Sequence, residues 1–105
     1  VRPAVFFVEE SLREPAFEAE AFGQGNTRRM PALRDTVWIT RAAGDVGIVL
    51  AHELFHVLAD LGRHETDPGN LMNERVGGDN TELHDWQCER LRKVATAFGL
   101  AVPAQ

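Results

Sequence analysis

The chain has 105 residues and a mass of 11.7 kDa, a length that accommodates one domain, which we take to span residues 1–105. Hydrophobic residues make up 44% and charged residues 26%, the composition of a folded globular protein rather than a disordered one. The net charge of −5 and the pI near 5.3 argue against a general binder of nucleic acid or of anionic membranes.

The sequence shows no pattern typical of a membrane-spanning helix or a signal peptide, and it has a single cysteine. No apolar run approaches the roughly 18 residues of a membrane-spanning helix, so we expect no membrane-embedded part. The chain begins at Val1 without a signal-peptide pattern, which suggests a processed product. Cys88 is the one cysteine, which excludes an internal disulfide and a multi-cysteine zinc site, and we interpret it as a packing residue.

The first half of the chain predicts strands and a loop. Residues 5–8 are apolar and rich in strand formers, and residues 36–40 give the clearest strand pattern of the chain. Residues 14–22 fit either a helix or a strand with one polar face, and we favour a strand over 16–22. Residues 23–35 contain turn residues and three arginines, and they predict a surface loop.

The next segment predicts a buried helix. It runs from Val46 to Leu61, with Asp45 as the N-cap and Gly62 as the left-handed residue that ends it. Because this helix is apolar on nearly every side, we expect other elements to cover more than one of its faces. Its few polar side chains, at positions 52, 53, 56 and 60, therefore need an explanation.

The remaining residues predict a bent loop and a final helix. Residues 63–80 contain a proline and several glycines, which exclude one long helix. Asn80 or Thr81 caps a last helix that continues to Phe98 and is stopped by Gly99. The expected fold class is α+β, with a short mixed sheet packed on the buried helix, then the loop and the C-terminal helix.

Residues 52–56 form the motif His-Glu-Leu-Phe-His, or HExxH. One helical turn places His52 and His56 on the same face, which is the geometry for two nitrogen ligands of one zinc ion. Glu53 is positioned to reach a metal-bound water without ligating the metal, as a general base must. The pattern therefore indicates a catalytic zinc site that needs a third protein ligand.

The segment from His64 to Met72, His-Glu-Thr-Asp-Pro-Gly-Asn-Leu-Met, extends this motif. It resembles the metzincin metallopeptidases, especially the matrixin-like branch, in which a third zinc histidine precedes a Ser-Thr-Asp-Pro type loop and a methionine turn beneath the metal. The resemblance covers residues 51–72 and implies a minimal zincin-like catalytic domain. It assigns His52, His56 and His64 as zinc ligands, Glu53 as general base and Met72 as the methionine-turn residue.

One feature departs from the family consensus HExxHxxGxxH. Ala59 stands where the family has glycine, Gly62 stands where it has the third histidine, and His64 follows two residues later. We interpret this spacing as a two-residue extension of the helix before the turn.

An alternative third ligand is Glu74. In gluzincins the third ligand is a glutamate on a following helix, and Asn73-Glu74 weakly resembles that pattern. Glu74 lies between Pro68-Gly69 and Gly77-Gly78, where no long helix can hold it, so we favour His64.

The resemblance implies a zinc-dependent endopeptidase acting on a peptide or protein that lies along an edge strand, for which residues 16–22 are the candidate. The chain has no tyrosine, which excludes the branches with a tyrosine on the metal. A second oxyanion donor would be backbone, an arginine or His84, which we expect to be exposed. The resemblance also favours a secreted or periplasmic protein.

A second interpretation is a zinc-binding structural or interaction module, or a protease subunit completed by a partner chain or pro-segment. Only 51 residues precede His52, so the N-terminal half of a metzincin is much reduced, and a core this small is expected to need metal or a partner. The presence of Glu53 favours the enzyme, because a purely structural zinc site needs no general base.

Overall fold

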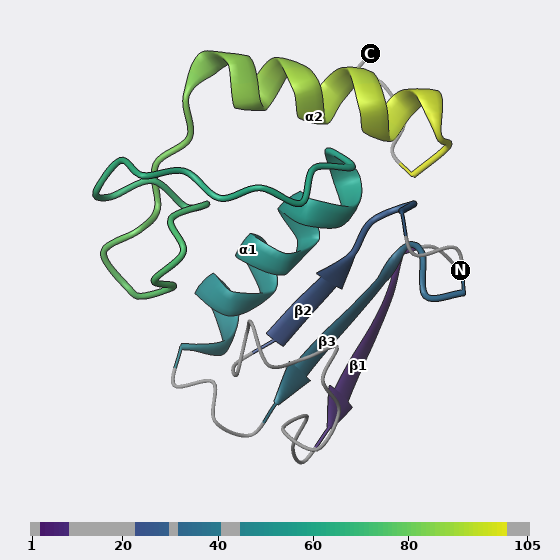
Figure 1. Cartoon of the computed structure of the whole chain (residues 1–105), viewed down its shortest axis with the longest axis horizontal. Helices are drawn as coiled ribbons and strands as arrows, with labels where there is room; N and C mark the ends of the chain where they lie inside the picture. Colours follow the sequence, from purple (N-terminus) through teal and green to yellow (C-terminus); the bar gives the residue numbers. More distant parts are fainter. Residues whose placement is uncertain (1–2, 9–22, 30–31, 41–44, 101–105) are drawn as a thin grey trace.

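The computed structural model describes residues 3–8, 23–29, 32–40 and 45–100, and it has the expected α+β class. Its elements in chain order are β1 (Ala4–Val8), β2 (Gly23–Asn26), β3 (Thr36–Thr40), α1 (Val46–Leu58) and α2 (Asp85–Ala97). Figure 1 shows α1 between the sheet and α2. The strand proposed for residues 16–22 lies outside the described residues.

The three strands form a mixed sheet in the order β1-β3-β2. β1 runs parallel to β3 with Val5 opposite Val37, and β2 runs antiparallel to β3 with Gly25 opposite Val37. β3 is central because its Thr-Val-Trp-Ile-Thr sequence supplies β-branched and aromatic side chains for both faces. The strands predicted for residues 5–8 and 36–40 are thereby confirmed.

The loop predicted for residues 23–35 is wrong at its start, where Gly23–Asn26 forms β2. Gly-Gln-Gly-Asn has none of the side chains that favour strands, so its extended conformation depends on pairing with β3 and packing on α1. The Asn26 side chain anchors its end by donating a hydrogen bond to Thr36 Oγ1 at 3.0 Å.

One face of the sheet packs on α1. Val37 and Ile39 alternate along β3, and both are buried in a cluster with Val49 and Val57 of the helix. Trp38 points to the opposite face, where its ring lies 5.0 Å from that of Phe6. The core therefore joins the sheet and the helix that carries HExxH, which holds the motif at a fixed distance from β2.

Helix α1 begins as predicted, because the Asp45 side chain accepts a hydrogen bond from the Ile48 amide at 3.2 Å. Its predicted end at Leu61–Gly62 is wrong: the helix ends at Leu58, and Asp60 takes the left-handed conformation with φ of 48°. The Leu61 amide donates to the His56 carbonyl and the Asp60 amide to the Val57 carbonyl, which is a Schellman motif.

Arg90 of α2 stabilises this end of the helix. Its Nε donates to the Ala59 carbonyl at 2.7 Å and its Nη2 to the Asp60 carbonyl at 3.0 Å. A guanidinium at a helix C-terminus satisfies terminal carbonyls and opposes the negative end of the helix dipole. The two extra residues before His64 therefore lengthen the loop rather than the helix, which corrects the interpretation drawn from their spacing.

Helix α2 begins later than predicted, at Asp85 rather than after Asn80 or Thr81. Glu82 is held in an extended conformation because its amide donates to the Gly69 carbonyl and its carbonyl accepts from the Leu71 amide. The predicted end is confirmed, since Gly99 has φ of 72° and follows the C-cap Phe98. Among the described residues, no helix is long and apolar enough to cross a membrane.

Candidate metal centre

Two of the candidate ligands lie on consecutive turns of α1. His52 and His56 are almost fully buried, and each ring is fixed by a backbone carbonyl: His52 Nδ1 lies 2.7 Å from the Leu71 oxygen and His56 Nδ1 lies 2.7 Å from the Leu61 oxygen. A carbonyl only accepts, so Nδ1 carries the proton in both rings and Nε2 is the atom with a lone pair for a metal. Such outer hydrogen bonds orient histidine ligands in metal sites.

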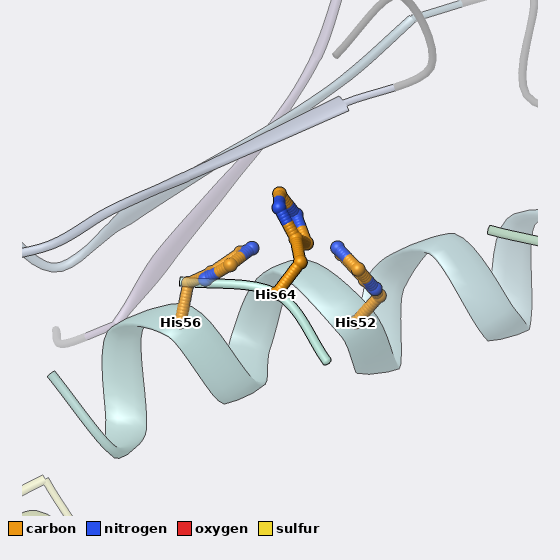
Figure 2. A group of neighbouring side chains, drawn as sticks. All are labelled: His52, His56 and His64. Carbon is orange, nitrogen blue, oxygen red and sulfur yellow. The ribbon is translucent and has the colours of Figure 1, made fainter. Parts of the chain in front are cut away.

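The third histidine reaches the same place from the loop after α1. Ligand nitrogens of His52, His56 and His64 lie within 4.8 Å of one another. The His64 ring is 5.2 Å from that of His52 and 5.0 Å from that of His56, measured between centroids. Figure 2 shows the three rings pointing into one space, two from the helix and one from the loop. The sequence prediction thus named three side chains that the fold brings together.

The loop geometry explains how His64 returns to the helix. The left-handed turn at Asp60 reverses the chain, and the Glu65 amide then donates to the Met72 carbonyl at 2.8 Å. This short parallel bridge, between Glu65 and Asn73, connects the residue after His64 to the segment that contains Met72. His64 is therefore held from both sides, although it lies in no helix or strand.

Glu53 lies beside the histidines and is 1% exposed. Its Oε1 is 4.0 Å from His56 Nε2, so the carboxylate borders the space that the rings share. Strand β2 covers it from the other side, because Gly23 and Gly25 let the strand backbone approach the helix closely. A Cβ at Gly23 would lie 3.2 Å from Glu53 Cγ, and a Cβ at Gly25 would lie 2.1 Å from the Glu53 carbonyl oxygen.

Met72 and its neighbours support His52. Met72 is 1% exposed in a cluster with Phe55, Ala59 and Leu71, and its amide donates to Asn70 Oδ1 at 2.8 Å. This segment also provides the Leu71 carbonyl that holds the His52 ring. Met72 therefore occupies a buried turn next to the residue whose carbonyl holds the His52 ring.

A pair of buried amides fixes that turn to α2. Gln87, which is fully buried, accepts from Asn70 Nδ2 at 2.8 Å and donates to Asn70 Oδ1 at 3.1 Å. Gln87 Oε1 also accepts from the His84 amide at 2.7 Å, which caps α2. The link runs from α2 through Asn70 and the Leu71 carbonyl to the ring of His52.

Sequence reasoning missed the roles of Gln87, Asn70, Gly25 and Arg90. Gln87 had a usable signal, because a polar residue on the inward stripe of a helix must find a partner when it is buried. The sequence holds no signal for the roles of Asn70 and Arg90, because their partners lie 17 and 31 residues away along the chain. Gly25 looked like a turn residue, while its function is to allow close packing.

Other candidates lie apart from the histidines. Glu74 is exposed on the loop and does not belong to the metal-binding group found among the described residues. His84 is exposed as predicted, and its Nε2 pairs with Asp67 Oδ2 at 2.6 Å, which links the loop after His64 to the start of α2. Cys88 is a partly buried free thiol.

The donor set fits a zinc ion. Three neutral imidazoles are the ligands of many catalytic zinc sites, where Zn–N distances of about 2.0–2.1 Å place the nitrogens about 3.3 Å apart. Since the ligand nitrogens lie within 4.8 Å of one another, the rings need to close by about 1.5 Å at most. His64 is only partly buried, which leaves one side of the site open to solvent.

Comparisons with known proteins do not assign the chain to a family. No protein-family profile, no curated protein sequence and no solved structure matches the chain.

Proposed function

We propose that the protein is a zinc-dependent endopeptidase with a metzincin-type site. The observation that carries the proposal is the convergence of His52, His56 and His64 beside a buried glutamate. Three protein ligands leave a coordination position for water, whereas a structural zinc site closes its fourth position. Burying a carboxylate has a desolvation cost, and proton transfer is the role that the position of Glu53 beside the histidines suits.

The chemistry assigns a separate role to each group. A zinc ion at this site would lower the pKa of a bound water and polarise the scissile carbonyl. His52 and His56 would hold the ion with rings oriented by the Leu71 and Leu61 carbonyls. Glu53 would accept the proton of the water as its oxygen attacks the carbonyl carbon, and would deliver that proton to the amine as the C–N bond breaks.

We assign the substrate to strand β2. β2 is an edge of the described sheet and packs on α1 at the level of Glu53 and His56. An extended peptide added to its outer edge would pair with the backbone and pass the catalytic glutamate. The strand expected for residues 16–22 lies outside the described residues and stays the other candidate for the edge strand. Backbone pairing tolerates many sequences, so preference would come from side-chain pockets.

The zincin fold, a secreted or periplasmic location and a partner chain or pro-segment belong to the same proposal. The zincin fold is supported by the arrangement of the sheet, helix α1 and the buried turn that contains Met72. The need for a partner is supported by β1, whose Phe6 and Phe7 are 44% and 68% exposed among the described residues.

The proposal is tested by replacing the proposed base without changing its size. We expect Glu53→Gln to keep one zinc per chain and to lose at least about 100-fold in the hydrolysis of a quenched fluorescent peptide library. Glu74→Gln is the matched control, because Glu74 is exposed and lies outside the histidine group. It should retain both zinc and activity.

Two results would contradict the proposal. Undiminished hydrolysis by Glu53→Gln would remove Glu53 from the reaction. A wild-type protein that binds one zinc tightly but cleaves no member of the library would favour the alternative, a zinc-binding structural or interaction module.

A further inference from the structure

A hollow of about 420 Å³ lies between the loop that precedes His64 and helix α2. Arg63 borders it on the loop side, and α2 contributes Trp86, Glu89, Arg90, Lys93 and Val94. These α2 positions repeat at intervals of three and four residues, so they share one face of the helix. The volume is within the range of about 300–1,000 Å³ that is typical of ligand sites.

The lining of this hollow is positively charged, in contrast to the chain as a whole. It carries three cations and one carboxylate, whereas the protein has a net charge of −5. Lys93 is the only lysine in the sequence. Within the part of the chain that the structure describes, neither Arg63 nor Lys93 forms a salt bridge. Two cations that form no salt bridge with a described residue therefore face one hollow.

Trp86 adds an aromatic surface and places one of these cations. Its side chain is 37% exposed, and the guanidinium carbon of Arg63 lies 5.2 Å from the centre of its ring. This cation–π contact restricts the Arg63 side chain while leaving its N–H groups able to bind a carboxylate in a bidentate manner. Arg90 is fixed as well, because two of its nitrogens donate to the Ala59 and Asp60 carbonyls.

We propose that this hollow binds an acidic peptide segment that carries an aromatic side chain. Carboxylates of the segment pair with Arg63 and Lys93, and the aromatic side chain packs on Trp86 and Val94. The lining has only three cations and also a carboxylate, so it suits a short segment with a few carboxylates better than an extended polyanion such as nucleic acid, which needs a longer basic surface. The site does not use the histidines, so it is independent of the proposed peptidase activity.

The charge of Glu89 provides a further test of ligand binding in the hollow. It lies four residues before Lys93, the spacing at which Glu and Lys pair on a helix surface, and it borders the same hollow. Its carboxylate forms no salt bridge with Lys93, but its negative charge faces the same hollow and repels the carboxylates of the ligand. Removing its charge should therefore strengthen binding, which a merely structural role of these residues does not predict.

The probe is the acetylated and amidated peptide Glu-Glu-Phe-Glu-Glu, with Gln in place of every Glu as the control peptide. Binding is measured by titration calorimetry on the full chain carrying Glu53→Gln, so that the probe is not hydrolysed. We expect one site per chain for the acidic peptide, weakened by added salt, and no binding of the control peptide. Free glutamate at the same carboxylate concentration separates peptide recognition from capture of any carboxylate.

Variants of the lining test the location. Arg63→Glu and Lys93→Glu should each weaken binding about fivefold or more, and Glu89→Gln should tighten it about twofold. Arg92→Glu is the matched control, because Arg92 is exposed on α2 next to Lys93 but does not line the hollow. It should change affinity less than about twofold. Circular dichroism and thermal unfolding establish that each variant is folded.

Several outcomes would overturn the inference. Absence of binding by the acidic peptide would remove the site, and equal binding of the glutamine peptide would remove its charge selectivity. Equal weakening by Lys93→Glu and Arg92→Glu would reduce the effect to general attraction by the helix surface. Since no histidine takes part, these results do not depend on whether the protein proves to be a peptidase.

Discussion

Strand β2 and helix α1 pack closely at Gly25, and the substitution Gly25→Ala tests this contact. A Cβ at Gly25 would lie 2.1 Å from the Glu53 carbonyl oxygen and 3.0 Å from the Cβ of His56. Ordinary contact begins at 3.4 Å, so strand and helix must separate by about 1.3 Å. The atoms that it meets belong to backbone, which cannot rotate away as a flexible side chain can.

We expect this substitution to cost at least about 3 kcal/mol of unfolding free energy, the upper end of the range for overpacked cores. It should also weaken zinc binding, because Glu53 and His56 belong to the segment that is displaced. Urea denaturation of the metal-free chain measures the first effect, and a competition titration with a chelator measures the second.

Gly62→Ala and Gly77→Ala are the matched controls. A Cβ at either position meets no atom within 4 Å, and neither residue has a positive φ. Both should be neutral or slightly stabilising, by up to about 1 kcal/mol. If Gly25→Ala unfolds at the same urea concentration as Gly62→Ala and binds zinc equally well, β2 does not pack on the helix as described.

Two further predictions concern the helix start and the support of His52. Asp45→Ala removes the side chain that accepts from the Ile48 amide and should destabilise the chain by about 1 kcal/mol in urea denaturation, whereas an unchanged midpoint would exclude the cap. Gln87→Leu leaves the buried Asn70 amide and the His84 amide without their partner, at a cost of about 2–4 kcal/mol. It should also weaken zinc binding about tenfold through the Leu71 carbonyl, so a chelator titration that matches wild type would disconnect α2 from the metal centre.

The site histidines were predictable because their chemistry has a short-range pattern. His52 and His56 are one turn apart on a helix whose apolar sequence and N-cap are visible without the fold. His64 was named through a resemblance, and the structure places its ring with the other two. The fold class was accessible for a similar reason, since β3 and both helices have strong local patterns.

The failures have a common physical cause, which is that distant contacts decide the local structure. Helix α1 ends at Leu58, before a left-handed turn at Asp60 whose carbonyls Arg90 binds from α2, and the sequence near Gly62 gives no sign of this contact. The region before α2 stays extended because Glu82 pairs with the backbone of residues 69–71. β2 is a strand only because α1 and β3 surround two glycines.

The central claim is that three histidines hold one zinc ion, and metal content tests it most directly. Wild type, His64→Ala and Glu74→Ala are purified, reconstituted with zinc, dialysed and analysed by atomic emission. We predict one zinc per chain in wild type and in Glu74→Ala, and a lost or greatly weakened site in His64→Ala. Full zinc affinity without His64, or no zinc in the wild-type protein, would contradict the account.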